Sequence, residues 1–370
     1  MINTVATLYI GNVKKNVFYS QVRKYQSCLD RATSGEDVPG DVYRRLLDCI
    51  DANISSLHRY LRYRRQQLGY EELHMYDLHV PITKGVDEGV EYDEACKLVK
   101  EALAPLGDEY GKLLDRAFTQ GWIDVYENKG KRSGAYSWGC YGAHPYVLLN
   151  YQKTMHDVFT IAHELGHAMH SYYSNSTQPY AKAEYKIFVA EVASTVNEVL
   201  LVRHMLSTAE GERKKYLLSY LLDMFRTTVF RQTQFAEFEY EAHKMAEEGK
   251  PMSAESLCEI YKKLNDKYYI TEGVADDELI KYEWARIPHF YNAFYVYKYS
   301  TGLISALCIA DNILTNGESA VAAYKQFLKA GGSMSPVEIL KLAGVDLTGD
   351  KPYKQAMEIF NDTLRQLESL

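Results

Sequence analysis

This sequence of 370 residues has few prolines, no long apolar run and no excess of positive charge. Nine prolines and no low-complexity stretch give no sign of an interdomain linker, so we expect one domain over 1–370, with two lobes at 1–125 and 126–370 as the alternative. No apolar run is long enough to cross a bilayer, and we expect no membrane partner. The 42 basic residues are outnumbered by 49 acidic ones, and this net charge of −7 argues against a nucleic-acid partner.

Cysteine pairs at the spacing of metal or redox sites are also missing. The six cysteines are scattered, and most lie among apolar residues of predicted helices. We therefore expect reduced packing residues rather than disulfides or metal ligands. The first six residues lack the basic region and cleavage site of a signal peptide, which favours a cytoplasmic location.

The stretch that stands out is 162–170, which contains the pattern H-E-x-x-H. In a helix, His163 and His167 lie one turn apart on the same face and can bind one metal ion together. Glu164 lies about 100° further around the helix, where it can take a proton from an attacking water without becoming a ligand. The pattern alone arises by chance in roughly a few chains per hundred of this length, so the flanking sequence has to support it. Apolar residues at helical spacing do so, as in a buried helix: Phe159, Ala162, Gly166, Met169 and Tyr173.

A catalytic zinc site needs a third protein ligand and an open fourth position. Residues 184–202 again have a helical pattern, with Glu191, Ser194, Thr195 and Glu198 along one polar stripe in an otherwise apolar surface. We expect this second helix to pack across the first, so that Glu191 reaches the metal while Glu198 orients a ligand histidine. The alternative for the stripe is an exposed acidic helix face.

Residues 128–151 interrupt the helical pattern with four glycines interleaved with aromatic residues. Such a pattern predicts small β-hairpins or a loop, and it leads directly into the candidate metal helix. A glycine-rich, aromatic-lined strand beside a metal site is suited to hold an extended peptide through main-chain hydrogen bonds, and an ordinary hairpin is the alternative. The substrate-binding candidates in this segment are Gly139, Tyr141, Gly142 and His144.

The run HELGHAMHSYYS, followed 24 residues after its second histidine by EVASTVNE, resembles the thimet-oligopeptidase superfamily of zinc peptidases, and most closely its oligoendopeptidase F branch. The similarity covers nearly the whole chain and includes the segments NVFYSQVRKYQS, ELHMYDLHVP, SGAYSWGCYGAHPYVLLNY and RIPHFYNAFYVYKYSTG. The resemblance implies one zinc ion per chain, held by His163, His167 and Glu191, with Glu164 as the catalytic base.

The same resemblance implies a mainly α-helical, zincin-type catalytic domain with a small β-hairpin element beside the zinc helix, forming a deep cleft or channel. A narrow channel admits short peptides and excludes folded chains, so we expect short peptide substrates. Members of the branch usually carry a further helical region before the NVFYS-like segment. We therefore expect this chain to correspond to the C-terminal catalytic region, with the N-terminal region of the family absent, either as a fragment or as a natural short form with a more open cleft.

Residues 286–302 are expected to complete the site. The segment has the length of a helix, on which Tyr291 and Tyr295 would lie on one face. Peptide hydrolysis passes through an oxyanion that a neutral phenol or imidazole can stabilise. The resemblance assigns such donor roles to a histidine and two or three tyrosines: His289, Tyr291, Tyr295 and, with a shift of register from Lys298, Tyr297.

Outside the site, helical patterns over 13–32 and 41–68 predict a helical hairpin. The second helix ends in three arginines, including Arg64, before Gly69, which fits a helix C-terminus with a solvated basic face. Residues 73–82 alternate between apolar and polar and predict a short extended segment.

Together these patterns predict a zinc-dependent endopeptidase that hydrolyses internal bonds of short oligopeptides. One alternative is a metallo-carboxypeptidase of similar architecture, which needs a cation for the substrate's terminal carboxylate; Arg286 is the nearest candidate. A non-catalytic peptide-binding protein is the other alternative, and the intact Glu164 counts against it. No pattern indicates the oligomeric state.

Overall fold

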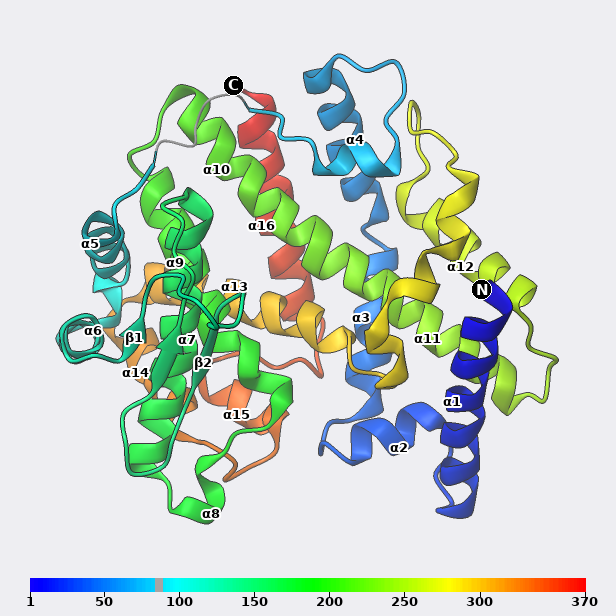
Figure 1. The fold of residues 1–370 in the computed structure, drawn as a ribbon, viewed down its shortest axis with the longest axis horizontal. Coiled ribbons are helices and arrows are strands. Elements are labelled where there is room, and N and C mark those ends of the chain that lie inside the picture. Colours follow the sequence, from blue (N-terminus) through cyan, green and yellow to red (C-terminus); the bar gives the residue numbers. More distant parts are fainter. Residues whose placement is uncertain (84–88) are drawn as a thin grey trace. The chain divides into compact units, whose positions relative to one another are not determined.

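The computed structural model describes residues 1–83 and 89–370, which form two compact units. The first unit combines Met1–Ile82, Ser219–Thr301 and Tyr353–Leu370, and the second combines Thr83–Leu218 and Gly302–Pro352. Three helices carry the chain from one unit to the other: α10 (Gly211–Met224), α13 (Tyr297–Asn316) and α16 (Lys351–Glu368) (Figure 1). The chain leaves each unit and later returns to it. Each unit therefore contains residues from both of the continuous lobes, 1–125 and 126–370, that the sequence suggested as an alternative.

The regular elements of the first unit are all helices, joined by loops, and one isolated β-bridge links Leu73 to Val274. Its elements are α1 (Ile2–Val22), α2 (Cys28–Ser34), α3 (Gly40–Asp51), α4 (Ile54–Leu68), α11 (Arg231–Glu247), α12 (Ala254–Tyr269), the π-helix η4 (Phe225–Phe230) and the 3-10 helices η1 (Met75–His79), η5 (Glu278–Arg286) and η6 (Pro288–Tyr291). The helix expected over 13–32 is two helices, because Lys24 adopts a φ of +60° between them.

Two further expectations for this unit are corrected. Residues 73–82 are not one extended segment, because Asp77 accepts the backbone N–H of His74 and caps the 3-10 helix η1 instead. Arg64 does not lie on a solvated face: its guanidinium is buried, pairs with Asp223 at 3.0 Å, and donates to the carbonyl of Val80 at 2.6 Å. The helix end itself is as expected, with Gly69 in the left-handed conformation at φ +71°.

The second unit contains the small β element. Its helices are α5 (Tyr92–Ala102), η2 (Ala104–Leu106), α6 (Asp108–Thr119), α7 (Met155–Thr177), α8 (Tyr180–Ala183), η3 (Ile187–Val189), α9 (Ala190–Leu206), α14 (Glu318–Lys329) and α15 (Pro336–Leu342). Its strands are β1 (Ile123–Asp124), β2 (Tyr136–Trp138) and β3 (Tyr146–Leu148), in the order β1-β3-β2.

The three-stranded sheet confirms the hairpin expected beside the metal helix and adds one strand to it. β2 pairs antiparallel with β3, with Ser137 opposite Val147, and β1 pairs parallel on the other side of β3. Both hairpin strands pack on α7. The prediction of a mainly α-helical fold with a small β element is therefore confirmed.

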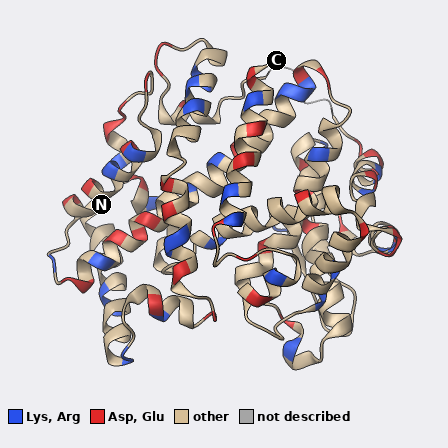
Figure 2. Ribbon diagram, turned by 180° about the vertical axis from the view of Figure 1, so that it is seen from behind, with Lys and Arg blue, Asp and Glu red and all other residues tan. Residues whose placement is uncertain are grey.

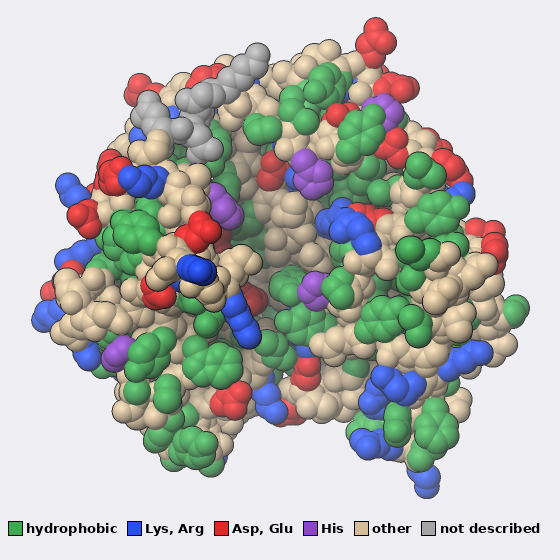
Figure 3. All heavy atoms as spheres, viewed as in Figure 1, with side chains coloured by type: hydrophobic (Ala, Val, Ile, Leu, Met, Phe, Trp, Pro, Cys, Tyr) green, Lys and Arg blue, Asp and Glu red, His purple; other side chains and the backbone are tan. Residues whose placement is uncertain are grey.

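The charge pattern is mixed along the described helices. Figure 2 shows acidic and basic residues interspersed rather than segregated. On the face drawn in Figure 3, hydrophobic side chains are likewise scattered among charged ones. Among the helices that the structure describes, none is both long and apolar enough to cross a membrane. The six cysteines are all free, as predicted. Cys28, Cys258 and Cys308 are buried, whereas Cys49 and Cys96 are half-buried and Cys140 is exposed, so the predicted packing role does not extend to Cys140.

Candidate metal centre

Helix α7 carries the H-E-x-x-H pattern and has a well-defined start. Thr154 is its N-cap: the Thr154 hydroxyl accepts the N–H of Asp157 at 3.2 Å, while the Asp157 carboxylate accepts the N–H of Thr154 at 2.8 Å. This reciprocal capping box satisfies two of the N–H groups that the first turn leaves unpaired. The helix then runs for 23 residues, so His163 and His167 lie one turn apart in its interior, as predicted.

Gly166 allows the second helix of the site to approach α7 closely. A Cβ atom at this position would lie 2.4 Å from the Cα of Ser194 and 2.5 Å from the carbonyl oxygen of Ala193, both on α9. Glycine is therefore required here by the backbone of the neighbouring helix. The close crossing brings Glu191, in the first turn of α9, beside the two histidines.

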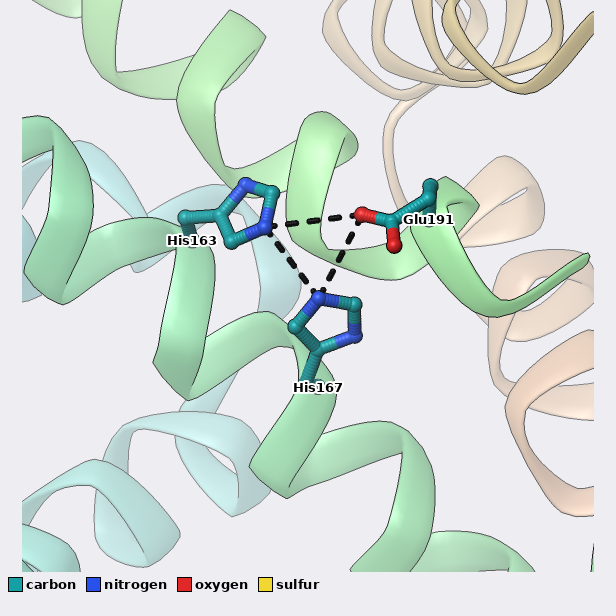
Figure 4. A group of neighbouring side chains, drawn as sticks. All are labelled: His163, His167 and Glu191. Carbon is teal, nitrogen blue, oxygen red and sulfur yellow. Dashed lines mark hydrogen bonds and ion pairs between the residues drawn. The ribbon is translucent and has the colours of Figure 1, made fainter. Parts of the chain in front are cut away.

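The three side chains converge on one point (Figure 4). The Nε2 atoms of His163 and His167 are 3.1 Å apart, and Oε2 of Glu191 lies 3.5 and 3.4 Å from them. Zinc bonds of about 2.0–2.1 Å in tetrahedral geometry place neighbouring donors about 3.3–3.4 Å apart, so the observed triangle has the size that a zinc ion needs. Among the described residues, this is the one group of three such donors that could hold a metal ion.

Glu198 orients the first of these histidines. Its Oε1 lies 2.5 Å from Nδ1 of His163, which leaves Nε2 directed at Glu191 and His167. Burial opposes protonation of His163, but the hydrogen bond and charge of Glu198, with the other two glutamates, raise its pKa to about 9. The pKa of Glu191 is lowered from its usual value because His167 and His163 outweigh the effect of burial.

Asn197 is a site residue that the sequence interpretation missed. Its Nδ2 donates to the carbonyl oxygen of Ala162 at 3.0 Å, and its Oδ1 accepts from the hydroxyl of Tyr110 at 3.1 Å. Asn197 is fully buried and ties α9 to the turn of α7 just before His163. The only signal in the sequence was an amide next to Glu198 within an otherwise apolar stretch.

Glu164 lies beside the metal-binding triangle without belonging to it. It is only 6% exposed, and its Oε2 has no hydrogen-bond partner in the part of the chain that the structure describes. Burial raises the pKa of Glu164, while the two neighbouring imidazoles oppose the rise. A buried carboxylate with one free oxygen next to the ligands is what the predicted base requires.

The glycine-rich segment is held in place by contacts within its own unit. A Cβ at Gly139 would lie 2.5 Å from Cβ of Ser171 on α7, and Gly142 has a φ of +81°. The hydroxyl of Tyr141 donates to the carbonyl of Gln178 at 3.2 Å, and the ring of His144 stacks on buried Trp122 with centroids 5.3 Å apart. Each predicted substrate-binding residue therefore helps to hold this segment in its conformation. Contact of these residues with a substrate stays a prediction.

The four predicted oxyanion donors belong to the first compact unit, whereas the metal ligands belong to the second. His289 and Tyr291 are exposed, and Tyr295 is half-buried with its ring centroid 6.1 Å from that of His289. Tyr297 is 1% exposed and packs 4.9 Å from the ring of Tyr43, which makes it the least accessible of the four. Their donor roles stay predictions.

The segment that carries these donors is not the continuous helix that we expected. The 3-10 helix η6 ends at Tyr291, and α13 begins only at Tyr297. Between them Phe294 adopts a φ of +58°, which an α-helix cannot contain. Tyr291 and Tyr295 therefore do not share a helix face.

The chain is similar over almost its whole length to known peptidases. The family model described as "Peptidase family M3" matches residues 2–359. Oligopeptidase PepF of Bacillus subtilis is 46% identical over 369 residues, which cover 100% of this chain and 55% of that protein. Group B oligopeptidase PepB of Streptococcus agalactiae is 41% identical over 370 residues, again all of this chain and 61% of that protein.

A solved structure gives the same result for the fold. The crystal structure of oligoendopeptidase-F from Enterococcus faecium superposes with a TM-score of 0.80 at 36% identity, covering 100% of this chain and 60% of that one. The chain thus spans between 55% and 61% of the length of these three relatives. The match of the family model over almost the whole sequence shows that the chain belongs to peptidase family M3.

Proposed function

We propose that this chain is the catalytic region of a zinc-dependent endopeptidase that hydrolyses internal bonds of short oligopeptides. The observation that carries the proposal is the convergence of His163, His167 and Glu191 at zinc-ligand spacing, with Glu164 buried beside them. Membership of peptidase family M3 supports hydrolysis of peptide bonds, and the names of the relatives point to oligopeptides.

The residues of the site divide the chemistry among them. A zinc ion held by the two histidines and Glu191 would polarise the scissile carbonyl and lower the pKa of water to about 7. Glu164 takes the proton from the attacking water and returns it to the leaving nitrogen. Glu198 holds His163 in the tautomer that presents Nε2 to the metal, and Asn197 keeps α9 in place.

The outer strand of the sheet offers a place for the substrate main chain. Among the residues that the structure describes, β2 pairs with β3 alone, so its other edge offers backbone groups for an extended peptide, and Tyr136 and Trp138 on it are exposed. We propose that this edge, with the Gly139–Gly142 turn that follows, binds the peptide. Oxyanion stabilisation by His289, Tyr291, Tyr295 or Tyr297 is part of the proposal and rests on the family resemblance.

The metallo-carboxypeptidase alternative has less support. It needs a free cation for a terminal carboxylate, and Arg286 is already paired with Glu283 at 2.5 Å. A non-catalytic peptide-binding protein would not need a buried Glu164 next to the ligands. A cytoplasmic location and a stoichiometry of one zinc ion per chain also remain predictions.

The test is cleavage of an internally quenched peptide of about ten residues, long enough to engage a groove on both sides of the cut. Wild type and Glu164→Gln are compared, with zinc content measured on both and the products identified by mass spectrometry. We expect internal cleavage by wild type, a loss of about 10²- to 10⁴-fold in kcat for the variant, and the same zinc content in both. Stepwise removal of terminal residues would favour the carboxypeptidase, and peptide binding without cleavage would favour the binding protein.

A further inference from the structure

The turn between η6 and α13 has a backbone conformation that needs support. Phe294 lies in the left-handed region, which residues with bulky side chains rarely adopt unless the surrounding structure imposes it. His289 precedes this turn and Tyr295 follows Phe294 directly. The conformation of Phe294 therefore sets the direction in which Tyr295 leaves the turn.

One buried side chain holds the turn. Glu239 of α11 is fully buried, and its Oε1 accepts a hydrogen bond from the N–H of Phe294 at 2.9 Å. Its Oε2 has no hydrogen-bond partner among the residues that the structure describes. Burial raises the pKa of Glu239 well above its usual range, against the opposing effects of the Phe294 N–H and Lys298. The Oε1 atom of Glu239 acts as the hydrogen-bond acceptor for the turn.

Packing around Phe294 locks the turn to the same helix. The Phe294 ring lies 4.6 Å from the ring of His243, one turn after Glu239 on α11, and 5.6 Å from the ring of Tyr43. His243 donates from Nδ1 to the carbonyl oxygen of Glu239 at 2.7 Å, while Asn16 donates to its Nε2 at 3.2 Å. Every contact belongs to the first compact unit, so α11 and the turn are fixed relative to each other.

Beyond the turn, the aromatic side chains form a small cluster. The ring centroid of Tyr295 lies 6.1 Å from that of His289 and 5.5 Å from that of Tyr299. The ammonium of Lys298 lies 4.8 Å from the centroid of the Tyr295 ring. The orientation of Tyr295 thus depends on where the turn places its backbone, and the turn depends on the Glu239 bond.

We propose that Glu239 is a positioning residue for peptide hydrolysis: by accepting the N–H of Phe294, it fixes the turn that sets Tyr295 against His289. This inference rests on the proposed function, in which His289 and Tyr295 stabilise the oxyanion. Without the acceptor, either a buried N–H loses its partner or the turn rearranges. A misplacement of the Tyr295 side chain by about 1 Å can lower the rate of hydrolysis roughly 100-fold. Because the oxyanion forms only during the reaction and not in the bound substrate, the decrease falls on kcat rather than on substrate binding.

Three variants test the proposal. Glu239→Gln keeps an oxygen acceptor of the same shape, Glu239→Met fills the space without an acceptor, and Leu257→Ala removes a fully buried side chain from α12 as a control for lost stability. We expect Glu239→Met to lower kcat by about 10- to 100-fold with KM and zinc content little changed. Glu239→Gln should retain most of the activity, and Leu257→Ala should lower the melting temperature without a comparable change in kcat.

Hydrogen exchange separates this proposal from the proposed function, because it needs no activity. The Phe294 amide should exchange slowly in wild type and Glu239→Gln, and much faster in Glu239→Met, even if the chain cleaves no peptide. Tyr295→Phe in the same kinetic assay tests the donor role separately. The positioning role is overturned if the Phe294 amide stays protected in Glu239→Met, or if the Met and Gln variants lose kcat equally, in step with their melting temperatures.

Discussion

Replacement of Gly166 by alanine should destroy the metal site without touching any ligand. The added Cβ would lie 2.4 Å from the Cα of Ser194, 2.5 Å from the carbonyl oxygen of Ala193 and 2.7 Å from the amide nitrogen of Ser194. These are backbone atoms of α9, so no change of side-chain rotamer relieves the contact. Ordinary van der Waals contact begins at 3.4 Å, and the two helices must therefore separate by about 1 Å.

The consequence for the site follows from the same geometry. Glu191 lies on α9 and the two histidines on α7, so separating the helices moves one ligand away from the other two. Metal–ligand distances tolerate only about 0.2 Å of deviation. We expect zinc affinity to fall by at least about 100-fold, since loss of an outer hydrogen-bond partner alone costs about 10- to 100-fold. Overpacking should also lower the free energy of unfolding by about 1–3 kcal/mol.

The assay is competition for zinc with a chromogenic chelator, together with thermal unfolding followed by circular dichroism. Gly111→Ala is the matched control, because Gly111 lies inside α6 of the same unit and a Cβ there would have no atom within 4 Å. Alanine at position 111 should leave zinc affinity unchanged and increase stability by about 0.5–1 kcal/mol. If Gly166→Ala binds zinc like wild type and is as stable as the control, the argument from close helix packing is refuted.

Three further predictions concern single side chains. Glu198→Ala should lower zinc affinity by about 10- to 100-fold in the same competition assay, and Glu198→Gln by less, since the amide oxygen can still accept from His163. Arg64→Ala should lower the free energy of unfolding in urea by about 1–3 kcal/mol, because it removes a buried guanidinium that donates to the carbonyl of Val80 and pairs with Asp223, which is one-third exposed and keeps its ion pair with Arg226; an effect below about 0.5 kcal/mol would contradict a structural role for Arg64. His243 is buried, and burial is the main reason that its pKa is lowered to about 4. Below pH 6.5 the imidazole binds a proton in the unfolded chain but not in the folded one, so the folded state is fully stable above pH 6.5 and loses stability as the pH falls towards 4. Between pH 7 and 5 wild type should therefore lose about 2 kcal/mol more than His243→Gln in urea unfolding, and equal losses would contradict this assignment.

The parts of the fold that depend on local sequence were predictable. The spacing of His163 and His167 fixes their relation on any helix, and a capping threonine with a flanking apolar stripe makes that helix form. The glycine-rich break before it predicted the hairpin of β2 and β3 for the same reason, since turns and short strands are specified by neighbouring residues. The interior position of three of the six cysteines also followed from their apolar neighbours.

Predictions from the local sequence pattern were wrong where a side chain from a distant part of the chain determines the backbone conformation or the burial of a residue. The alternation over 73–82 predicted an extended segment, but Asp277, 202 residues beyond Met75 in the chain, accepts the N–H of Met75 at 2.8 Å and joins Asp77 at the start of the 3-10 helix η1. The helical spacing after Arg286 gave no sign of the break at Phe294, whose left-handed conformation is held by Glu239 from another part of the chain. The basic end of α4 suggested solvent, whereas Arg64 is buried through its contact with Asp223, 159 residues further along the chain.

For the site, the sequence by itself determined which residues are present and how the two histidines are spaced on one helix. Only the tertiary structure decided that Glu191 comes within 3.5 Å of both, that Glu198 reaches Nδ1 of His163, and that Glu164 is buried beside them. The physical reason is that these distances depend on how closely α7 and α9 cross. That distance is set by the contact of Gly166 with the backbone of the other helix, which no pattern within either helix specifies.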